Sequence, residues 1–283
     1  MRALCEPVVF GARDVLEAQG LSLNKIRVVE TQQREFHIGE VHPEHGRAAI
    51  DAARAAIEAA LAGEYAAVVA APHSETAIRA AGIEFDGYPS FVARTAGLAP
   101  EDAILMLCFA HGGREVRIAH VTLHCSVLDA LRMISKERVL RTIRAVHDSL
   151  EKIGIRRPKI AVSGVNPHAS GEAERAVIAP AIEEAARSIV VDGPIGADTL
   201  IQREGYDAYV VMLHDQGHVA AKLLAPNRAA ALTIGTPVLF SSVAHGAGFD
   251  IAGRNRADPA AMVEAITRLV THRRRAPATR KRR

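Results

Sequence analysis

Short apolar runs rich in Val, Ile and Leu alternate along the chain with longer segments in which apolar residues recur every three or four positions. Such alternation is typical of a mostly parallel sheet covered by helices, so the pattern predicts an α/β fold. The runs predict strands at residues 65–71, 103–108, 117–123, 159–164, 188–192, 208–213, 230–234 and 238–241. The longer segments predict helices at residues 43–62, 135–153, 172–186 and 259–272.

The composition is that of a globular chain. The 283 residues are 49% hydrophobic and 24% charged, which provides apolar surface for one large core or two domains. The longest apolar stretches fall far short of the roughly 20 residues of a membrane helix, and the first residues lack the pattern of a secretory signal. The three cysteines are widely spaced and predict neither a disulfide framework nor a metal-binding pair. We therefore expect a cytoplasmic protein with no membrane partner.

The formal net charge of +3 comes from the last segment, residues 273–283, which carries seven positive charges and no acid. Without this segment the net charge is −4. We interpret it as a disordered, solvated tail, because it contains no aromatic residue and adjoins no nucleic-acid-binding motif. Nucleic acid is therefore not an expected partner.

Three histidines lie at or shortly after the carboxyl ends of predicted strands. They are His124, His168 and His214. Ligands of open α/β sheets bind beyond the carboxyl ends of the strands, so three imidazoles there can converge on one divalent cation. Neutral imidazole suits zinc, iron, cobalt or nickel. The alternative is that each histidine is separately hydrogen-bonded, and strand ends alone do not decide between the two.

Two charged residues accompany His214. Asp215 is either a partner that orients the histidine or contacts the metal, or the N-cap of a helix. Lys222 is either a group that binds a substrate carboxylate or moves protons, or a solvated surface lysine. A glycine-rich loop at residues 244–253 allows its backbone to approach a ligand closely, but the Rossmann fingerprint GxGxxG is absent.

An ordered set of motifs resembles the 4-hydroxythreonine-4-phosphate dehydrogenase (PdxA) family over residues 7–272. The motifs are Ala-Gly-Ile-x-Phe-x-Gly at 81–87, Asn-Pro-His-Ala at 166–169, Asp-Gly-Pro-x-x-Ala-Asp-Thr at 192–199, His-Asp-Gln-Gly at 214–217 and Asp-Ile-Ala-Gly at 250–253. The resemblance implies the two-domain fold of isocitrate and isopropylmalate dehydrogenases, which binds NAD or NADP without a Rossmann motif. It places the first domain at residues 1–86 plus 229–272, and the second, with the metal site, at residues 87–228.

The resemblance also implies the chemistry: metal-dependent oxidation of a secondary alcohol, followed by loss of carbon dioxide from the β-keto acid. His124, His168 and His214 match the family's ligands for a divalent metal, which is zinc, iron, cobalt or magnesium. These ligands come from both subunits, so a homodimer with shared active sites is expected. Lys222 and Asp215 are the expected catalytic residues. The expected contacts of the cofactor's adenosine are His245, Gly246 and Asp250.

The substrate-contacting positions depart from the phosphothreonine enzymes. The family's Gly-His-Thr-Glu segment is Gly87-Tyr88-Pro89-Ser90 here, and its substrate-binding Asn and Arg align with Ala231 and Phe240. Residues 72–78, 120–124 and 214–227 are more similar to the branch that oxidises cis-dihydrodiol carboxylates in terephthalate breakdown. We therefore expect such a diol or a related hydroxy acid as the substrate. The alternative substrate is 4-hydroxythreonine 4-phosphate. A further alternative is that the protein is a dimeric scaffold without catalytic activity.

Two further departures concern the rim of the site. The family's opening strand and Gly-Asp-Pro-x-Gly-x-Gly-Pro-Glu loop have no counterpart in the printed sequence. A missing strand of this kind exposes a sheet edge. The loop after Asn166-Pro167-His168 is also shorter than in the family, which implies a different setting for His168.

Overall fold

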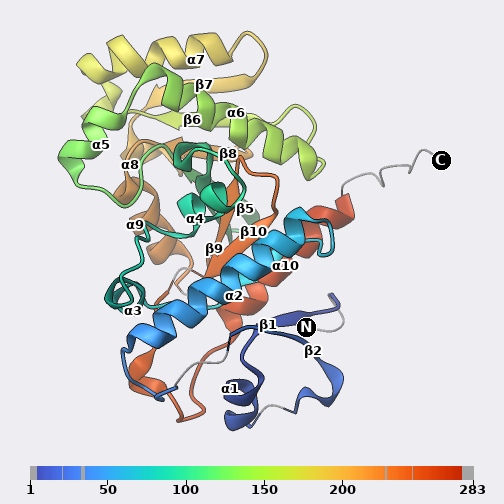
Figure 1. Ribbon diagram of the computed structural model, residues 1–283. Coiled ribbons are helices and arrows are strands. Elements are labelled where there is room, and N and C mark those ends of the chain that lie inside the picture. Colours follow the sequence, from blue (N-terminus) through green and yellow to red (C-terminus); the bar gives the residue numbers. More distant parts are fainter. Residues whose placement is uncertain (1–4, 21, 33–35, 227, 244, 276–283) are drawn as a thin grey trace.

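A large mixed sheet forms the centre of the computed structural model, which describes residues 5–20, 22–32, 36–226, 228–243 and 245–275 (Figure 1). Its strands are β3 (Val68–Ala70), β4 (Ile104–His111), β5 (Arg114–His120), β6 (Lys159–Ser163), β7 (Val190–Ile195), β8 (Ala208–Val211), β9 (Ala230–Ile234) and β10 (Phe240–Val243). They lie in the order β3-β10-β9-β4-β5-β8-β6-β7. All eight predicted strands are present, and the predicted α/β class is confirmed.

The directions of the central strands determine which strand ends lie together. β5 pairs in parallel with β8, and β8 pairs in parallel with β6. The carboxyl ends of these three neighbours therefore meet at one edge of the sheet. β4 and β9 run antiparallel to their neighbours.

The predicted helices are α2 (Pro43–Leu61), α6 (Lys136–Lys152), α7 (Ala179–Ala185) preceded by the π-helical turn η4 (Glu174–Ile178), and α10 (Ala260–Arg275). The sequence patterns did not predict the shorter helices α1 (Arg13–Ala18), α3 (Glu75–Ala80), α4 (Tyr88–Thr95), α5 (Val127–Met133), α8 (Ala197–Leu200) and α9 (His214–Leu224). Single turns form at η1 (Leu23–Lys25), η2 (Pro100–Asp102), η3 (Pro167–Ala169) and η5 (Phe249–Ile251). A separate parallel pair, β1 (Val8–Gly11) and β2 (Arg27–Glu30), lies at the opposite end of the molecule from α7 (Figure 1).

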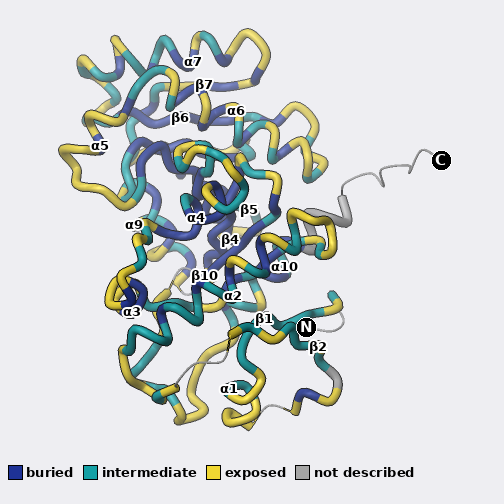
Figure 2. The backbone as a smooth tube through the Cα atoms, in the orientation of Figure 1, coloured by how far each residue is buried: buried dark blue, intermediate teal, exposed yellow. Residues whose placement is uncertain are grey.

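Helices cover both faces of the sheet. α6, α7 and α10 pack on one face, where Ile143 and Val146 meet Val162 and Val210. α8 and α9 cover the other face, and α2, α3 and α4 enclose β3 and β10. Figure 2 shows the buried backbone concentrated along the central strands. Each fully buried aliphatic side chain of this core contributes about 1.5–3 kcal/mol to folding.

α6 illustrates why these elements form. Its apolar residues recur at helical spacing, and its buried members are Val139, Leu140, Thr142, Ile143, Val146 and Leu150. Ser135 begins the helix as its N-cap, with Oγ accepting a hydrogen bond from the Arg138 amide at 3.2 Å. The sequence therefore determines both the buried face and the start of this helix.

The sequence and the structure differ at several boundaries. β5 ends at His120, three residues before the predicted end, and α10 continues three residues beyond its predicted end to Arg275. The rest of the predicted tail, residues 276–283, lies outside the described residues. The division into two domains stays a prediction, and β4 and β9 pair across its boundary. Among the described helices, none has the length and apolarity needed to cross a membrane.

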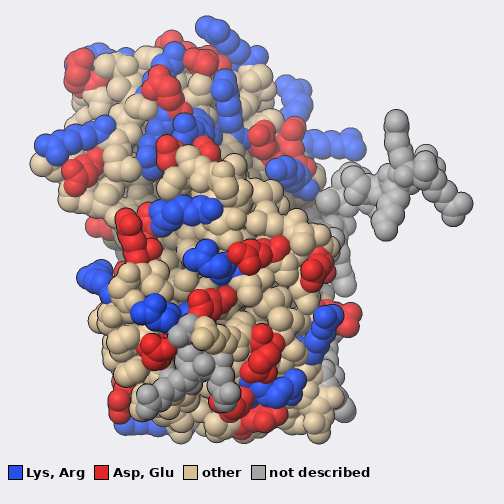
Figure 3. Space-filling view, viewed as in Figure 1, with Lys and Arg blue, Asp and Glu red and all other residues tan. Residues whose placement is uncertain are grey.

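Charged side chains of both signs alternate over the face shown in Figure 3. This mixing gives that face no extended field of one sign to attract a polyanion.

Candidate active site

Two of the predicted metal ligands lie together at the carboxyl edge of the sheet. His214 is the first residue of α9, directly beyond β8, and His124 lies on the segment that follows β5. Their ring centroids are 5.6 Å apart. Two imidazoles on one tetrahedral ion have centroids about 5 Å apart, given metal–nitrogen distances of about 2.0–2.1 Å. The pair therefore fits two ligands of one cation.

The hydrogen bonds of this pair leave one nitrogen of each ring available. His124 Nδ1 lies 3.5 Å from the Asp86 carbonyl oxygen, and His214 Nδ1 lies 2.7 Å from the Asp215 carboxylate. Both partners are acceptors, so each Nδ1 donates and each Nε2 keeps its lone pair for a metal. The hydrogen bond from His214 holds the pKa of Asp215 below its usual value. Asp215 lies in the first turn of α9, whose N-cap is Leu213, so its alternative interpretation as an N-cap is wrong.

Gln216 fixes the turn from which His214 projects. Its Oε1 accepts hydrogen bonds from the amides of Met212 and Leu213, at 2.9 and 3.0 Å. Its Nε2 donates to the carbonyl oxygen of Gly164 at 3.0 Å. The glutamine of the His-Asp-Gln-Gly motif thus ties the start of α9 to the end of β6.

His168 is not brought into this pair. It lies in η3 with a left-handed backbone (φ 58°, ψ 15°) and is exposed to solvent. Buried Glu174 holds the preceding loop by accepting hydrogen bonds from the amides of Val165 and Asn166 at 2.7 and 2.8 Å. Within the described residues of one chain, no group of three His, Cys, Asp or Glu side chains has the geometry to hold a metal.

Two histidines that the sequence analysis did not select support the pair. The His218 ring stacks on the His214 ring at 3.7 Å between centroids, with 11° between the planes. His120 lies 4.7 Å from His218 on the buried side. The spacing of four residues between His214 and His218 places both on one helix face, and this signal was available in the sequence.

His120 is a buried imidazole with one satisfied nitrogen. Its Nδ1 donates to the Leu105 carbonyl oxygen at 3.3 Å, while its buried Nε2 has no partner among the described residues. Burial lowers the pKa of His120 to about 3, and burial together with nearby His214 lowers the pKa of His218 to about 4. Gly217 makes room for this ring, because a Cβ there would lie 2.2 Å from His120 Nε2. Both rings are therefore neutral near pH 7.

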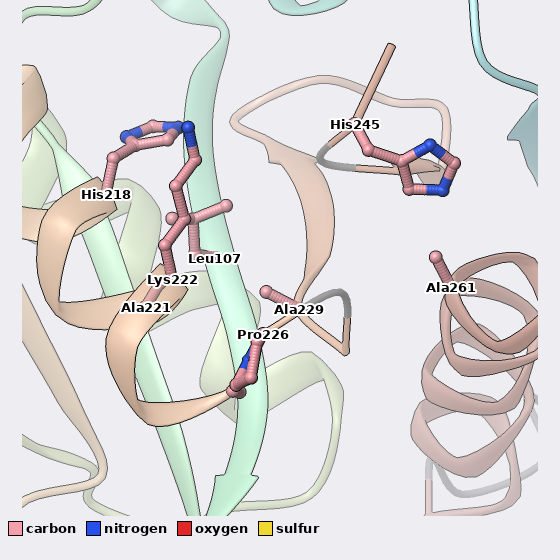
Figure 4. Close-up of a pocket in the computed structure, with 9 residues that line it drawn as sticks. Leu107, His218, Ala221, Lys222, Pro226, Ala229, His245 and Ala261 are labelled. Carbon is pink, nitrogen blue, oxygen red and sulfur yellow. The ribbon is translucent and has the colours of Figure 1, made fainter. Parts of the chain in front are cut away.

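A cavity of about 350 Å³ opens beside the stacked rings (Figure 4). His218 and Lys222 line one side, and His245 lies on the opposite side. The cavity thus brings together a predicted catalytic residue and a predicted cofactor contact. Gly246 and Asp250 are exposed on the segment after His245 and do not belong to the cavity lining.

A second cavity, of about 160 Å³, has the His120 ring in its lining. We call it the ring cavity; its polar lining residues are Asp86, Ser90, Glu101, His120, Arg138 and Thr142. It adjoins the metal-site candidate, because Asp86, whose carbonyl oxygen lies 3.5 Å from His124 Nδ1, is one of its lining residues. The two cavities are thus lined by residues that contact the histidines of the pair, Asp86 in the second cavity and His218 in the larger one.

The positions that match substrate contacts of the resembled family carry no charged side chain here. Tyr88 and Phe240 are both buried, and their rings lie 5.1 Å apart between centroids. Burial raises the pKa of Tyr88 to about 12, so its hydroxyl stays neutral. Ala231 is buried in β9. These side chains supply no cationic donor for a phosphate dianion.

Comparison with known proteins agrees with the motifs. The family model described as pyridoxal phosphate biosynthetic protein PdxA matches residues 3–269. The 1,2-dihydroxy-3,5-cyclohexadiene-1,4-dicarboxylate dehydrogenase of Comamonas sp is 45% identical over 237 residues, covering 82% of this chain and 74% of that protein.

Solved structures show the same relationship. 4-Hydroxythreonine-4-phosphate dehydrogenase from Klebsiella pneumoniae has a TM-score of 0.81 at 29% identity, covering 94% of this chain and 88% of that one. A terephthalate 1,2-cis-dihydrodiol dehydrogenase from Burkholderia xenovorans LB400 has a TM-score of 0.67 at 40% identity, covering 94% and 89%. Isocitrate dehydrogenase from Methylococcus capsulatus, at 15% identity and a TM-score of 0.52, is similar in fold alone and confirms the predicted fold class.

Proposed function

Because this chain belongs to the PdxA family, it is an oxidoreductase that acts on a CH–OH donor, and we propose that it oxidises a cis-dihydrodiol carboxylate with NAD or NADP as hydride acceptor. The proposed substrate is 1,2-dihydroxy-3,5-cyclohexadiene-1,4-dicarboxylate, the compound in the name of the Comamonas relative. We place the reaction in the cytoplasm, where free thiols such as buried Cys108 stay reduced.

One observation carries the choice of substrate. The buried contact between Tyr88 and Phe240 replaces the polar groups that a phosphorylated substrate requires, while His124 and His214 keep a spacing suited to a metal. A site of this kind supports oxidation of an alcohol that carries no phosphate.

The histidine pair supplies two metal ligands, and we propose that His168 of a second copy supplies the third. The donor set is three neutral imidazoles, which suits zinc, iron or cobalt better than magnesium. When bound, the ion would act as a Lewis acid toward the alcohol oxygen and the carbonyl that forms from it. Asp215 keeps the His214 ring oriented toward this role through its hydrogen bond to Nδ1.

The side chains around the substrate then have separate tasks. Oxidation transfers a hydride from the CH–OH carbon to the nicotinamide and releases the hydroxyl proton. The product is a β-keto acid, which loses carbon dioxide and leaves an enolate that becomes the phenol of a restored aromatic ring. Lys222, in the larger cavity, can stabilise the enolate oxygen by charge and donate the proton that it needs.

We propose that the larger cavity receives the cofactor. Its lining extends from Lys222, near the histidine pair, to His245. Gly246 and Asp250 follow on the same exposed segment, which suits contacts to adenosine outside the cavity. In this arrangement His218 would contact the nicotinamide end of the cofactor and His245 its adenosine end.

We propose that the active form is a homodimer. Val127, Leu128 and Leu131 expose apolar side chains on α5, which follows His124, and they are 67%, 60% and 45% exposed. On α9, Val219 and Leu223 are 53% and 76% exposed. Apolar surface of this kind next to an incomplete metal site is typical of a protein interface.

The substrate proposal is tested by comparing two substrates on zinc-, iron- or cobalt-loaded protein. We expect NADH or NADPH to form from the dihydrodiol dicarboxylate at a higher kcat/KM than from 4-hydroxythreonine 4-phosphate. Faster oxidation of the phosphorylated amino acid would reject the proposed substrate. His214→Ala tests the scaffold alternative, because an enzyme should lose bound metal and activity while its circular dichroism spectrum is retained.

A further inference from the structure

The ring cavity contains a cationic side chain that the reaction described above does not use. We propose that Arg138 is the receptor for a substrate carboxylate, namely the one on the ring carbon remote from the oxidised carbon. This inference rests on the proposed function and deepens it, since it names the residue that selects a dicarboxylate over a monocarboxylate.

The guanidinium of Arg138 is held in place and still has donors to offer. Its Nε donates to the Val121 carbonyl oxygen at 2.7 Å, and its backbone amide is capped by Ser135. In the described part of the chain, Nη1 and Nη2 have no hydrogen-bond or ion-pair partner. A guanidinium fixed in this way is preorganised for a planar carboxylate. Its position in the first turn of α6 adds the positive end of a helix dipole.

The size of the ring cavity suits a six-membered ring. Its volume is about 160 Å³. A protein cavity of about 150 Å³ holds benzene. A cyclohexadiene ring therefore fits the cavity that Arg138 lines, with little room for a longer substrate.

The distance between Arg138 and the metal-site candidate also agrees with the length of the proposed substrate. The carbonyl oxygen of Val121 accepts the hydrogen bond from Arg138, and Val121 lies three residues before His124. The Cα atoms of Val121 and His124 are therefore at most about 10 Å apart. Carboxyl carbons on opposite corners of a six-membered ring are about 6 Å apart. A ring whose diol end lies at the histidine pair can therefore present its remote carboxylate to Arg138.

In the part of the chain that the structure describes, the acidic side chains of the ring cavity form no ion pair with the Arg138 guanidinium. Asp86 forms an ion pair with Arg94. Burial lowers the pKa of Arg138, and the nearby charge of Glu101 opposes this, but the described residues show no ion pair between the two side chains. An entering carboxylate therefore meets an unpaired guanidinium.

The test measures binding of two ring acids to the metal-loaded protein by isothermal titration calorimetry. Terephthalate carries the remote carboxylate and benzoate lacks it. We expect Arg138→Gln to weaken terephthalate binding by about 10- to 100-fold and to leave benzoate binding within about twofold. Arg138→Lys, which keeps the charge but loses the planar fork, should lie between the two.

Arg141→Gln is the matched control. Arg141 lies one turn further along α6, forms an ion pair with Asp102 at 3.6 Å, and is absent from the cavity lining. Loss of its charge should leave the preference for terephthalate unchanged.

The inference is overturned if Arg138→Gln and Arg138→Lys both keep the wild-type preference, or if Arg141→Gln loses it equally. Wild-type protein that binds neither acid also overturns it. Turnover separates this inference from the proposed function. Failure to oxidise the dihydrodiol, with an Arg138-dependent preference for terephthalate, rejects the reaction and retains the carboxylate receptor.

Discussion

At the scale of single residues, the site depends on how each imidazole is held. His214 donates to Asp215 and stacks on His218, and His218 in turn packs against buried His120. The hydrogen bond to Asp215 fixes the tautomer of His214, and stacking on the His218 ring fixes the plane of the His214 ring. Orientation of this kind usually accounts for a substantial part of metal affinity.

Asp215→Asn should therefore weaken metal binding without unfolding the protein. We expect zinc affinity to fall by about 10- to 100-fold, as measured by competition with a chromophoric chelator. The matched control is Asp148→Asn on α6, where a neighbouring His147–Asp148 pair has a similar contact of 3.2 Å. If both variants keep wild-type affinity, Asp215 does not orient His214.

The buried histidines also predict how stability responds to pH. His120 and His218 have folded-state pKa values of about 3 and 4, below their ordinary value of 6.5. The unfolded chain therefore binds more protons below pH 6.5, and the free energy of unfolding falls as the pH is lowered from there toward 4. Two such groups give a slope of up to about 2.7 kcal/mol per pH unit.

Urea titrations of the metal-free protein between pH 7.5 and 4.5 measure this slope, above the range in which most carboxyl groups titrate. His120→Leu should reduce the slope by close to half. A wild-type unfolding free energy that does not change over this range would show that these imidazoles are accessible to protons in the folded protein.

At the scale of elements, the contact between α9 and β5 determines where His214 lies. Gly217 lets the helix approach the His120 ring at the end of β5. Alanine normally stabilises a helix by up to about 1 kcal/mol relative to glycine. Here the added Cβ collides with a buried ring, so the sign of the effect should be reversed.

Gly217→Ala should destabilise the protein by about 1–3 kcal/mol in urea titrations, because the ring or the helix must move. The double variant with His120→Ala should recover most of this loss. If Gly217→Ala alone is stabilising, α9 does not rest on His120 as described. Zinc affinity should fall in the single variant as well, since His214 moves with the helix.

The elements also show what sequence patterns can and cannot predict. The apolar runs predicted every strand of the central sheet, because strands that are buried on both faces, whether parallel or antiparallel, are continuously hydrophobic. The strand ends also indicated one edge of the sheet for His124 and His214, whose ring centroids lie 5.6 Å apart there. His120 was not selected, because burial around a polar side chain is a tertiary property, whereas the spacing of four residues between His214 and His218 was visible in the sequence. The short helices α3, α4 and α5 have too few turns for a periodic pattern to be distinct.

The position of His168 could not be predicted from the end of its strand alone. Its strand, β6, is parallel to β8 and lies beside it, so the strand rule places it at the correct edge. The loop that follows is fixed by hydrogen bonds to Glu174, and these depend on the π-helical turn at residues 174–178. No local sequence pattern revealed that turn.

At the scale of the whole molecule, the proposed dimer predicts complementation between two inactive variants. His168→Ala and His214→Ala each remove a ligand and should each be inactive. If His168 reaches across to the pair His124 and His214 of the other subunit, a mixed dimer rebuilds one intact site. After unfolding and refolding of an equal mixture, about a quarter of wild-type activity should return under random association.

A second mixture identifies which ligands share a subunit. If His168 and His214 act together and His124 comes from the other subunit, the first mixture stays inactive, and a mixture of His124→Ala with His214→Ala recovers activity. Recovery in neither mixture, with dimers confirmed by sedimentation, would contradict a shared site.

The pairing of β4 with β9 has a mechanical consequence. It extends over five residue pairs, from Ile104 opposite Ile234 to Cys108 opposite Ala230, and it joins the two predicted halves of the chain. A hinge cannot form where a ladder is continuous, so the halves can move relative to one another only by a change in the twist of the shared sheet. Such a motion is smallest at the ladder and grows toward β3 and β7. The histidine pair lies near the middle of the sheet, so we expect it to move less than β3 and β7.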